Sequence, residues 1–443
     1  MTQVNRTNRV GIPGAENTSL NTKSMRRIIA SAFLGNLIEY YDFLLYATAS
    51  AVVFSQVFFS DLPPAVGVFA SFGTLAAGYL ARPLGGAVFG HFGDKYGRKE
   101  VLIASMMLMG ISTTLVGLIP SPATIGVMAP IVLVMLRLLQ GFAVGGELGG
   151  SMLLVLEHAP AEKRGFAASF ANMGAAAGGI FATLAIALVS LLPNDQFVTW
   201  GWRVPFLFSV LLLAVGYLIR RSVTETPVFA NMDKTEAPDI PLVAMFKNNG
   251  KNLLTTVLSG MSLYAIAGIT TVWGLSRAIE AGVERTDALL VTTAGSIALV
   301  ASTMMSAKIS DRLGRRRVMM TGAVLILLSV PALLWLIDSG SVWFFTLAVV
   351  WAQAVEGLMF GPYGAFVGEQ FPTRVRYTGA SLSYQFSSII GGGMAPLAAA
   401  GLVVFASGST VALGAVWALT IAITVVAIYR AEERRSHHLE EIK

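Results

Sequence analysis

The chain has 443 residues, of which 55% are hydrophobic and 13% are charged. This balance is too apolar for an ordinary soluble protein. Its net charge of +6 does not indicate a nucleic-acid partner, because the basic residues are spread over loops, as expected for cytoplasmic loops of a membrane protein. The absence of cysteine excludes disulfides, thiol nucleophiles and cysteine metal sites.

A membrane-spanning helix needs about 20 mainly apolar residues, and such runs recur along the whole chain. The sequence predicts twelve spans, at 28–54, 66–90, 101–119, 125–156, 166–192, 204–219, 253–275, 288–307, 318–337, 342–368, 378–405 and 411–429. We therefore predict an all-α membrane protein, with the lipid bilayer as its surroundings. The polar N-terminus lacks the apolar core of a signal peptide, so we expect the first span to act as its own insertion signal. Most Lys and Arg residues fall at the termini and in alternate loops, which predicts that both termini are cytoplasmic.

Two of these spans carry polar residues on one face. In the first span, the spacing of three, three and four residues places Asn36, Glu39, Asp42 and Tyr46 on one side of the helix. In the fourth span, Arg137 and Gln140 also share a face with Glu147. A charge at the centre of a span costs about 2.5–3.5 kcal/mol on insertion scales, so these side chains are expected to be paired and functional. If the two faces meet, Asp42 and Arg137 form a buried pair that proton binding can break; the alternative is a fixed packing bridge, and Glu39 could serve only to orient its neighbours.

Other polar residues within spans are candidates for contact with a substrate. Arg82 in the second span offers a fork suited to a carboxylate, although it could instead be a gate residue near the cytoplasmic end. Glu356 lies in the middle of the tenth span, and the sequence names no partner for it. The C-terminal half adds Tyr264, Trp273, Tyr363, Tyr384 and Gln385, which either line a cavity or only pack. The predicted substrate-binding set is Asn36, Tyr46, Arg82, Gln140, Tyr264, Glu356 and Gln385.

A short polar loop occurs twice, as GHFGDKYGRK at 90–99 and AKISDRLGRR at 307–316. The Asp, Gly and Arg positions superpose without a gap, which implies two halves of like construction. The predicted organisation is a cytoplasmic tail at 1–27, a six-helix half at 28–221, a cytoplasmic linker at 222–251, a second six-helix half at 252–430, and a cytoplasmic tail at 431–443.

The repeated loop, G-x-x-x-D-[RK]-x-G-R-[RK], resembles the signature of the major facilitator superfamily. Further motifs are GNLIEYYDF at 35–43, ARPLGG at 81–86, RLLQGFAVGGE at 137–147, WGWRVPF at 200–206, ETPVF at 225–229 and EQFPTRVRYTG at 369–379. Together they resemble the metabolite:H+ symporter family, most closely its shikimate-transporter branch. Leu148 departs from that pattern, where a tryptophan is expected.

The resemblance implies two pseudo-symmetric halves that alternate around a mid-membrane site. It also implies uptake of a small, usually carboxylated metabolite with a proton. Matched to the family pattern, Asp42 and Arg137 are the proton-coupling pair, and Glu39 is placed with them. The implied cytoplasmic gate comprises Asp94, Arg98, Glu157, Arg164, Asp311, Arg315, Glu369 and Arg376. Within it we expect Arg98 to meet Glu157, Arg315 to meet Glu369, and Asp94 to lie at the start of the eleventh span.

We therefore expect an importer of a small organic acid in a bacterial inner membrane, driven by the proton gradient, with no cofactor, and monomeric. The alternatives are a proton symporter of a zwitterionic osmolyte of the proline or betaine type, or of a sugar. A membrane enzyme is disfavoured, because the four histidines lie at loop edges and in the tail and no metal or nucleophile centre is visible. A channel would not need the repeated loop or the buried carboxylates.

Overall fold

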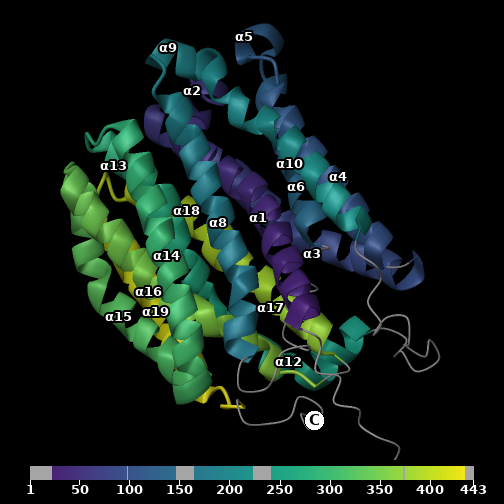
Figure 1. Cartoon of the computed structure of the whole chain (residues 1–443). Helices are drawn as coiled ribbons and strands as arrows, with labels where there is room; N and C mark the ends of the chain where they lie inside the picture. Colours follow the sequence, from purple (N-terminus) through teal and green to yellow (C-terminus); the bar gives the residue numbers. More distant parts are fainter. Residues whose placement is uncertain (1–21, 97, 146–163, 223–240, 373–374, 435–443) are drawn as a thin grey trace, which may run out of the picture.

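The computed structural model describes residues 22–96, 98–145, 164–222, 241–372 and 375–434. Every regular element among these residues is a helix, and the long helices run side by side as one bundle (Figure 1). The predicted all-α fold class is therefore confirmed. The start of α1 and the end of α19 lie at the same end of the bundle (Figure 1), as expected for an even number of spans.

The first half of the chain supplies the first six predicted spans. Its helices are α1 (Thr22–Val52), α2 (Phe54–Phe58), α3 (Pro64–Tyr96), α4 (Arg98–Gly117), α5 (Pro122–Ile125), α6 (Met128–Gly145), α8 (Arg164–Ser190), α9 (Asn194–Gln196), the π-helix η2 (Phe197–Gly201) and α10 (Arg203–Ser222). The short elements α2, α5 and α9 lie at the end of the bundle opposite the start of α1 (Figure 1). The second part of the predicted fourth span, 146–156, lies outside the described residues.

The second half supplies the other six spans, two of them interrupted. Its helices are α12 (Pro241–Ala267), η3 (Gly268–Trp273), α13 (Gly274–Glu280), α14 (Arg285–Leu313), α15 (Arg315–Asp338), α16 (Val342–Glu369), α17 (Arg376–Ser388), η4 (Ile389–Met394), α18 (Ala395–Phe405) and α19 (Val411–Arg430). Both η3 and η4 are π-helical, and η4 lies near the middle of its span, 378–405. Such segments are frequent at functional sites.

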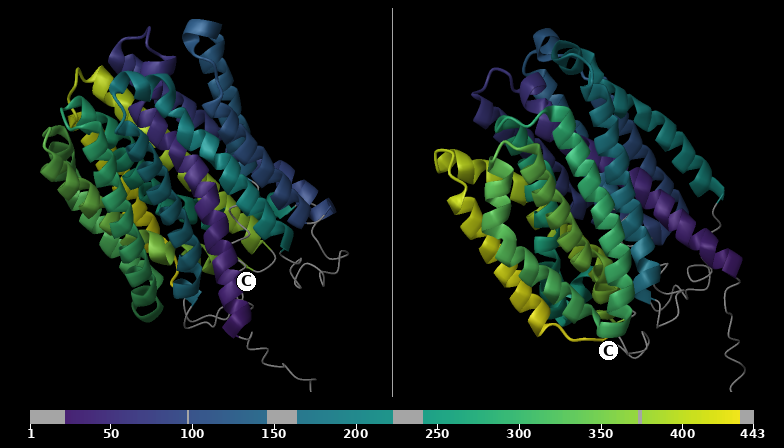
Figure 2. Two further views of the ribbon diagram at one scale, coloured as in Figure 1. Left: turned by 45° about the horizontal axis from the view of Figure 1, so that its top comes forward. Right: turned by 60° about the vertical axis from the view of Figure 1, so that its left-hand side comes forward.

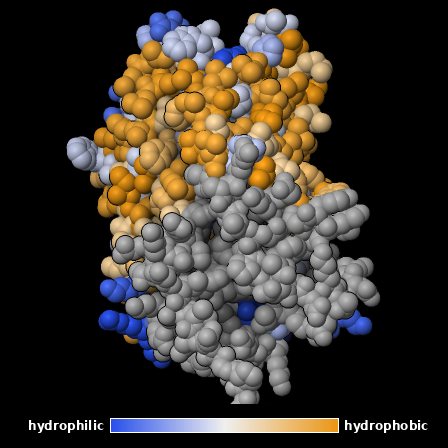
Figure 3. Space-filling model, turned by 45° about the vertical axis from the view of Figure 1, so that its right-hand side comes forward, coloured by the Kyte–Doolittle hydropathy of each residue, from blue (hydrophilic) through white to orange (hydrophobic). Residues whose placement is uncertain are grey.

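The length and composition of these helices fit a membrane. Within the described residues, ten stretches are long and apolar enough to cross a bilayer, and a shorter apolar stretch covers 103–117. Together with α1 they account for the twelve predicted spans. Large apolar side chains face outward, for example Leu84 at 67% exposure and Leu328 at 74%. One face of the molecule shows a broad hydrophobic surface below a polar rim (Figure 3). Backbone groups of a helix are satisfied internally, so this apolar exterior suits lipid.

The two halves pack against each other along two seams. In one seam α8 lies against α14, and in the other α3 lies against η4 and α18. The views in Figure 2 show helices of both halves side by side along the bundle. Close approach at the second seam depends on glycine, because a Cβ on Gly392 or Gly393 would press into the ring of Tyr79.

Candidate functional site

A close crossing of α3 and α6 positions the site. A Cβ on Gly141 would overlap the carbonyl oxygen of Gly78, and a Cβ on Gly145 would overlap that of Arg82. The two backbones therefore touch, as small residues at four-residue spacing allow in membranes. Gly78 also leaves the space that the Arg137 side chain crosses, since a Cβ there would clash with the guanidinium. The crossing brings Arg82 of α3 and Arg137 of α6 to one point in the interior.

Both arginines stack on the ring of Phe43 from α1. The guanidinium carbon of Arg82 lies 4.0 Å from the centroid of this ring, and that of Arg137 also lies 4.0 Å from it. A second ring flanks each cation: Tyr79 lies 4.3 Å from Arg82, and Tyr46 lies 4.2 Å from Arg137. Arg137 is fully buried and Arg82 is 4% exposed. The site therefore holds two cations that are surrounded by aromatic rings.

Neither arginine has an acidic partner among the described residues. Arg82 donates to the Ser388 hydroxyl at 3.2 Å, and its Nε has no partner. Arg137 donates to Oε1 of Gln140 at 3.3 Å, and its Nε and Nη2 have no partner. A buried charge without a counter-ion is costly. An anion that entered this site would find several unused donors.

The predicted ion pair between Asp42 and Arg137 is wrong for this structure. The Asp42 carboxylate accepts a hydrogen bond from Ser209 of α10 at 2.7 Å. The Thr113 hydroxyl of α4 lies beside it and donates to the Met109 carbonyl at 2.9 Å. Successive helical residues point about 100° apart, so Phe43, rather than its neighbour Asp42, faces the arginines. The two charges are instead linked indirectly, because Gln140 donates to Thr113 at 2.7 Å and accepts from Arg137.

The other predicted residues of α1 are buried on its inner side. Glu39 and Asn36 are 2% and 7% exposed. Tyr46 donates from its hydroxyl to Thr74 of α3 at 2.7 Å, which fixes the ring that lies beside Arg137. The structure thus brings Tyr46, Arg137 and Gln140 into contact in the interior, with Arg82 beside Arg137 on the Phe43 ring; Asn36 and Glu39 are buried on α1.

The C-terminal half reaches this interior through α17. Gln385 donates to the Gly145 carbonyl of α6 at 3.5 Å, and Ser388 receives the bond from Arg82. Tyr264 is half-buried and lies against Gly391 of η4. The rings of Tyr363 and Tyr384 meet edge to face, with centroids 5.0 Å apart. Arg82 therefore lies at the contact between the halves.

Glu356 is placed differently. It is 5% exposed, and its carboxylate accepts a hydrogen bond from Gln353, on the same helix, at 2.8 Å. No cation among the described residues pairs with it. Within the part of the chain that the structure describes, no hydrogen bond or ion pair joins the Glu356 side chain to the arginine site.

The predicted gate contact between Arg315 and Glu369 is present. Arg315 pairs with Glu369 at 3.2 Å and with Asp311 at 2.5 Å, and Asp311 also accepts from the Phe166 backbone of α8 at 3.0 Å. This group, which we call the Arg315 cluster, therefore joins the two halves at one end of the α8–α14 seam. Arg376 is buried and donates to the Gly368 and Phe371 carbonyls. The side chains of Asp94, Arg98, Glu157 and Arg164 lie outside the described residues.

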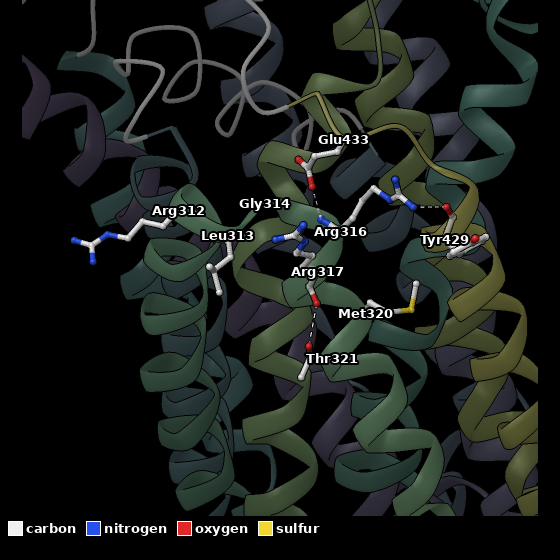
Figure 4. Close-up of a pocket in the computed structure, with 9 residues that line it drawn as sticks. All are labelled: Arg312, Leu313, Gly314, Arg316, Arg317, Met320, Thr321, Tyr429 and Glu433. Atoms are coloured by element: carbon white, nitrogen blue, oxygen red, sulfur yellow. Dashed lines mark hydrogen bonds between the residues drawn. The ribbon is translucent and has the colours of Figure 1, made fainter.

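A cavity of about 710 Å³ lies at the helix ends beside this cluster (Figure 4). Its lining residues are Arg312, Leu313, Gly314, Arg316, Arg317, Met320, Thr321, Tyr429 and Glu433. Glu433 accepts from the Arg316 backbone at 3.0 Å, and the Arg316 side chain donates to the Ile428 carbonyl at 3.1 Å. The two contacts connect the start of α15 to the end of α19. We therefore interpret this region as a structural contact between helix ends that is distinct from the arginine site.

Sequence reasoning missed five residues of the site. They are Phe43, Tyr79, Thr113, Ser209 and Ser388. One signal was available: Tyr79 lies three residues before Arg82 and therefore on the same helical face. Phe43 directly follows Asp42, but no rule of spacing shows that its ring, rather than the carboxylate, meets the arginines.

Comparison with known proteins agrees with the motifs. The family model described as Major Facilitator Superfamily matches residues 32–396 and 253–443. The chain is 37% identical over 435 residues to the inner membrane metabolite transport protein YhjE of Escherichia coli, covering 96% of this chain and 97% of that protein. It is 36% identical over 399 residues to the shikimate transporter of the same organism, covering 88% and 91%.

More distant similarities extend the same picture. The chain is 32% identical over 400 residues to the proline/betaine transporter of Salmonella typhimurium, covering 87% of this chain and 79% of that protein. The structure matches the proton:xylose symporter XylE bound to 6-bromo-6-deoxy-D-glucose with a TM-score of 0.75 at 18% identity, covering 95% and 99% of the two chains. These proteins are transporters rather than enzymes, and the predicted resemblance to metabolite transporters is confirmed.

Proposed function

Because this chain belongs to the Major Facilitator Superfamily, we propose that it imports a small organic acid together with a proton. The chain is a multi-pass inner-membrane transporter. In this proposal the halves 28–221 and 252–430 alternate around the arginine site, as in other carriers built from repeats. Both termini lie in the cytoplasm, and one chain is the working unit.

The observation that carries the proposal is the pair of buried arginines without acidic partners. Removing a counter-ion from a buried charge costs about 3–5 kcal/mol, so a carboxylate that supplied one would bind strongly. A guanidinium offers its N–H groups in a planar fork that matches a carboxylate. The Phe43 ring lies under both guanidinium groups, and Nε of Arg82 with Nε and Nη2 of Arg137 have no partner among the described residues, so these donors are open to the substrate.

The proton is assigned to Asp42. A carboxylate only accepts hydrogen bonds, whereas a protonated carboxyl also donates one. Protonation of Asp42 therefore adds a donor beside the Thr113 hydroxyl, whose oxygen accepts from Gln140, and Gln140 in turn accepts from Arg137. This series of contacts connects proton binding at Asp42 to Arg137, the residue that we propose binds substrate.

A second candidate is a zwitterion of the betaine type. The similarity to a proline/betaine transporter favours it, and so does the aromatic lining, because a quaternary ammonium binds well against aromatic faces. Such a ligand would present its carboxylate to the arginines in the same way. The two candidates differ in whether a cationic group adds affinity.

The test is a binding and uptake series with the purified protein in proteoliposomes. Shikimate, 2-oxoglutarate, citrate and glycine betaine are compared with methyl esters of the acids. We expect one acid to bind and accumulate when a pH gradient is imposed. Its ester should lose about 1.5–3 kcal/mol for each charge-assisted bond removed. Equal binding of acid and ester would overturn the proposal, and preference for betaine would favour the second candidate.

A further inference from the structure

The structure points to a positioning role for Phe43, a residue outside the predicted site. We propose that its ring holds the guanidinium groups of Arg82 and Arg137 in place, so that their N–H edges are ready for a substrate carboxylate. This inference rests on the proposed function, since it assigns the substrate to the same two arginines. It adds a residue that determines affinity without forming a hydrogen bond to the substrate.

The geometry is the first argument. Both guanidinium carbons lie 4.0 Å from one ring centroid, so they are at most twice that distance apart. Two like charges this close and this well buried repel each other, and in the described residues no carboxylate pairs with either of them. The electron-rich face of an aromatic ring attracts a cation, most strongly where water is excluded. Phe43 thus stabilises an arrangement that repulsion alone would disperse.

The donors left unused are the second argument. Among the described residues, Nε of Arg82 and both Nε and Nη2 of Arg137 have no hydrogen-bond partner. A polar side chain in place of Phe43 would form bonds with some of these N–H groups and compete with the substrate. A phenyl ring has no oxygen or nitrogen that would accept these bonds. This is the property expected of a support that positions two cations and leaves their donors free.

Phe43 is itself held firmly. It is 4% exposed, and its ring meets Tyr79 edge to face, with centroids 4.8 Å apart and planes at 85°. The ring therefore keeps one orientation while the arginines rest on it. Preorganisation of this kind increases affinity by lowering the ordering cost of binding.

The experiment replaces Phe43 with phenylalanines that carry one, two or three ring fluorines. Fluorine withdraws electrons from the ring face and changes its size little, so cation attraction falls stepwise in a protein that still folds. The matched control is the same series at Phe72, which is fully buried on α3 and has no arginine over its ring among the described residues. The probe is whichever of shikimate, 2-oxoglutarate or citrate stabilises the wild type most.

At Phe43 we expect the Kd and KM of the probe to rise with each fluorine, by roughly tenfold over the series, while kcat and proton coupling change little. Phe43→Leu should have a Kd and KM as high as those of the most fluorinated variant, and the Kd and KM should not change along the Phe72 series. Equal slopes at the two positions would overturn the inference and indicate a general packing effect.

A second measurement separates this inference from the proposed function. Without any acid, the melting temperature should decrease along the Phe43 series and stay constant along the Phe72 series. Absence of that decrease would show that the ring does not hold the arginines. A wild type that binds none of the three acids would instead overturn the proposed function, and the melting series would still decide the role of Phe43.

Discussion

Two buried arginines of this protein, Arg315 and Arg137, have opposite kinds of partner. Arg315 is 1% exposed and pairs with both Asp311 and Glu369. Arg137 is equally buried but lies on the rings of Phe43 and Tyr46 and, among the described residues, has no acidic partner. Each arginine contacts side chains of a neighbouring helix. Arg315 is neutralised by carboxylates of the protein, whereas the negative charge for Arg137 would come from a bound ligand.

The comparison separates structure from ligand binding. A buried arginine that pairs with two carboxylates has its charge neutralised within the protein, so its contacts can hold helices together. A buried arginine stacked on rings keeps its donors available and is stabilised further when an anion arrives. The Arg315 cluster therefore fits a lock between halves, and the arginine site fits a receptor for substrate.

The largest expected effect separates the acids of the two regions. Asp42→Asn should abolish uphill accumulation driven by a pH gradient, because in the proposed mechanism Asp42 is the residue that gains and loses the proton, while exchange of substrate across the membrane continues. The amide oxygen can still accept from Ser209, so folding should be retained. The measurement is uptake against a concentration gradient in proteoliposomes, with the exposed Asp61→Asn as control. Full accumulation by Asp42→Asn would remove this residue from the coupling mechanism.

The next effect tests the arginine site directly. Arg137→Lys keeps the charge but loses the planar fork and much of the stacking. We expect kcat/KM to fall about 100-fold, which corresponds to ~2.7 kcal/mol, together with a decrease in melting temperature like that of the Phe43 series. Arg317→Lys, at an exposed position on α15 (Figure 4), is the control and should transport normally. Normal transport by Arg137→Lys would place the substrate elsewhere.

A third change should affect stability more than binding. Glu369→Gln removes one of the two acids that face Arg315. Breaking a buried pair costs about 3–5 kcal/mol, and we expect the lower end because Asp311 remains. Thermal unfolding in detergent measures this cost, with the exposed Glu432→Gln as comparison. If Glu369→Gln unfolds like the wild type but binds substrate poorly, the contrast between the two regions is wrong.

The smallest effect concerns the first copy of the repeated loop. Asp94→Asn should slow transport about fivefold with nearly unchanged binding, because loss of about 1 kcal/mol from the closed cytoplasmic side shifts a balanced two-state equilibrium by that factor. Single cysteines placed in the cytoplasmic vestibule of this cysteine-free chain should be labelled faster. Wild-type turnover together with unchanged labelling would indicate that the loop only directs membrane topology.

The sequence by itself determined the helices, their number, the repeated loop and the polar face of the first span. These features follow from hydrophobic run length and from spacing along one helix, which are local properties. The pairing of Arg315 with Glu369 was also predicted, because the motifs that place these residues occur in a recognisable family pattern.

Only the tertiary structure decided which side chains meet at the centre. Asp42 and Phe43 are neighbours in sequence, and the packing of α1 against α3, α6 and α10 determines that the ring meets the arginines and the carboxylate meets Ser209. The contact of Arg82 with Ser388 joins residues 306 positions apart. No local pattern encodes such a contact, because it depends on how closely glycines allow distant helices to approach.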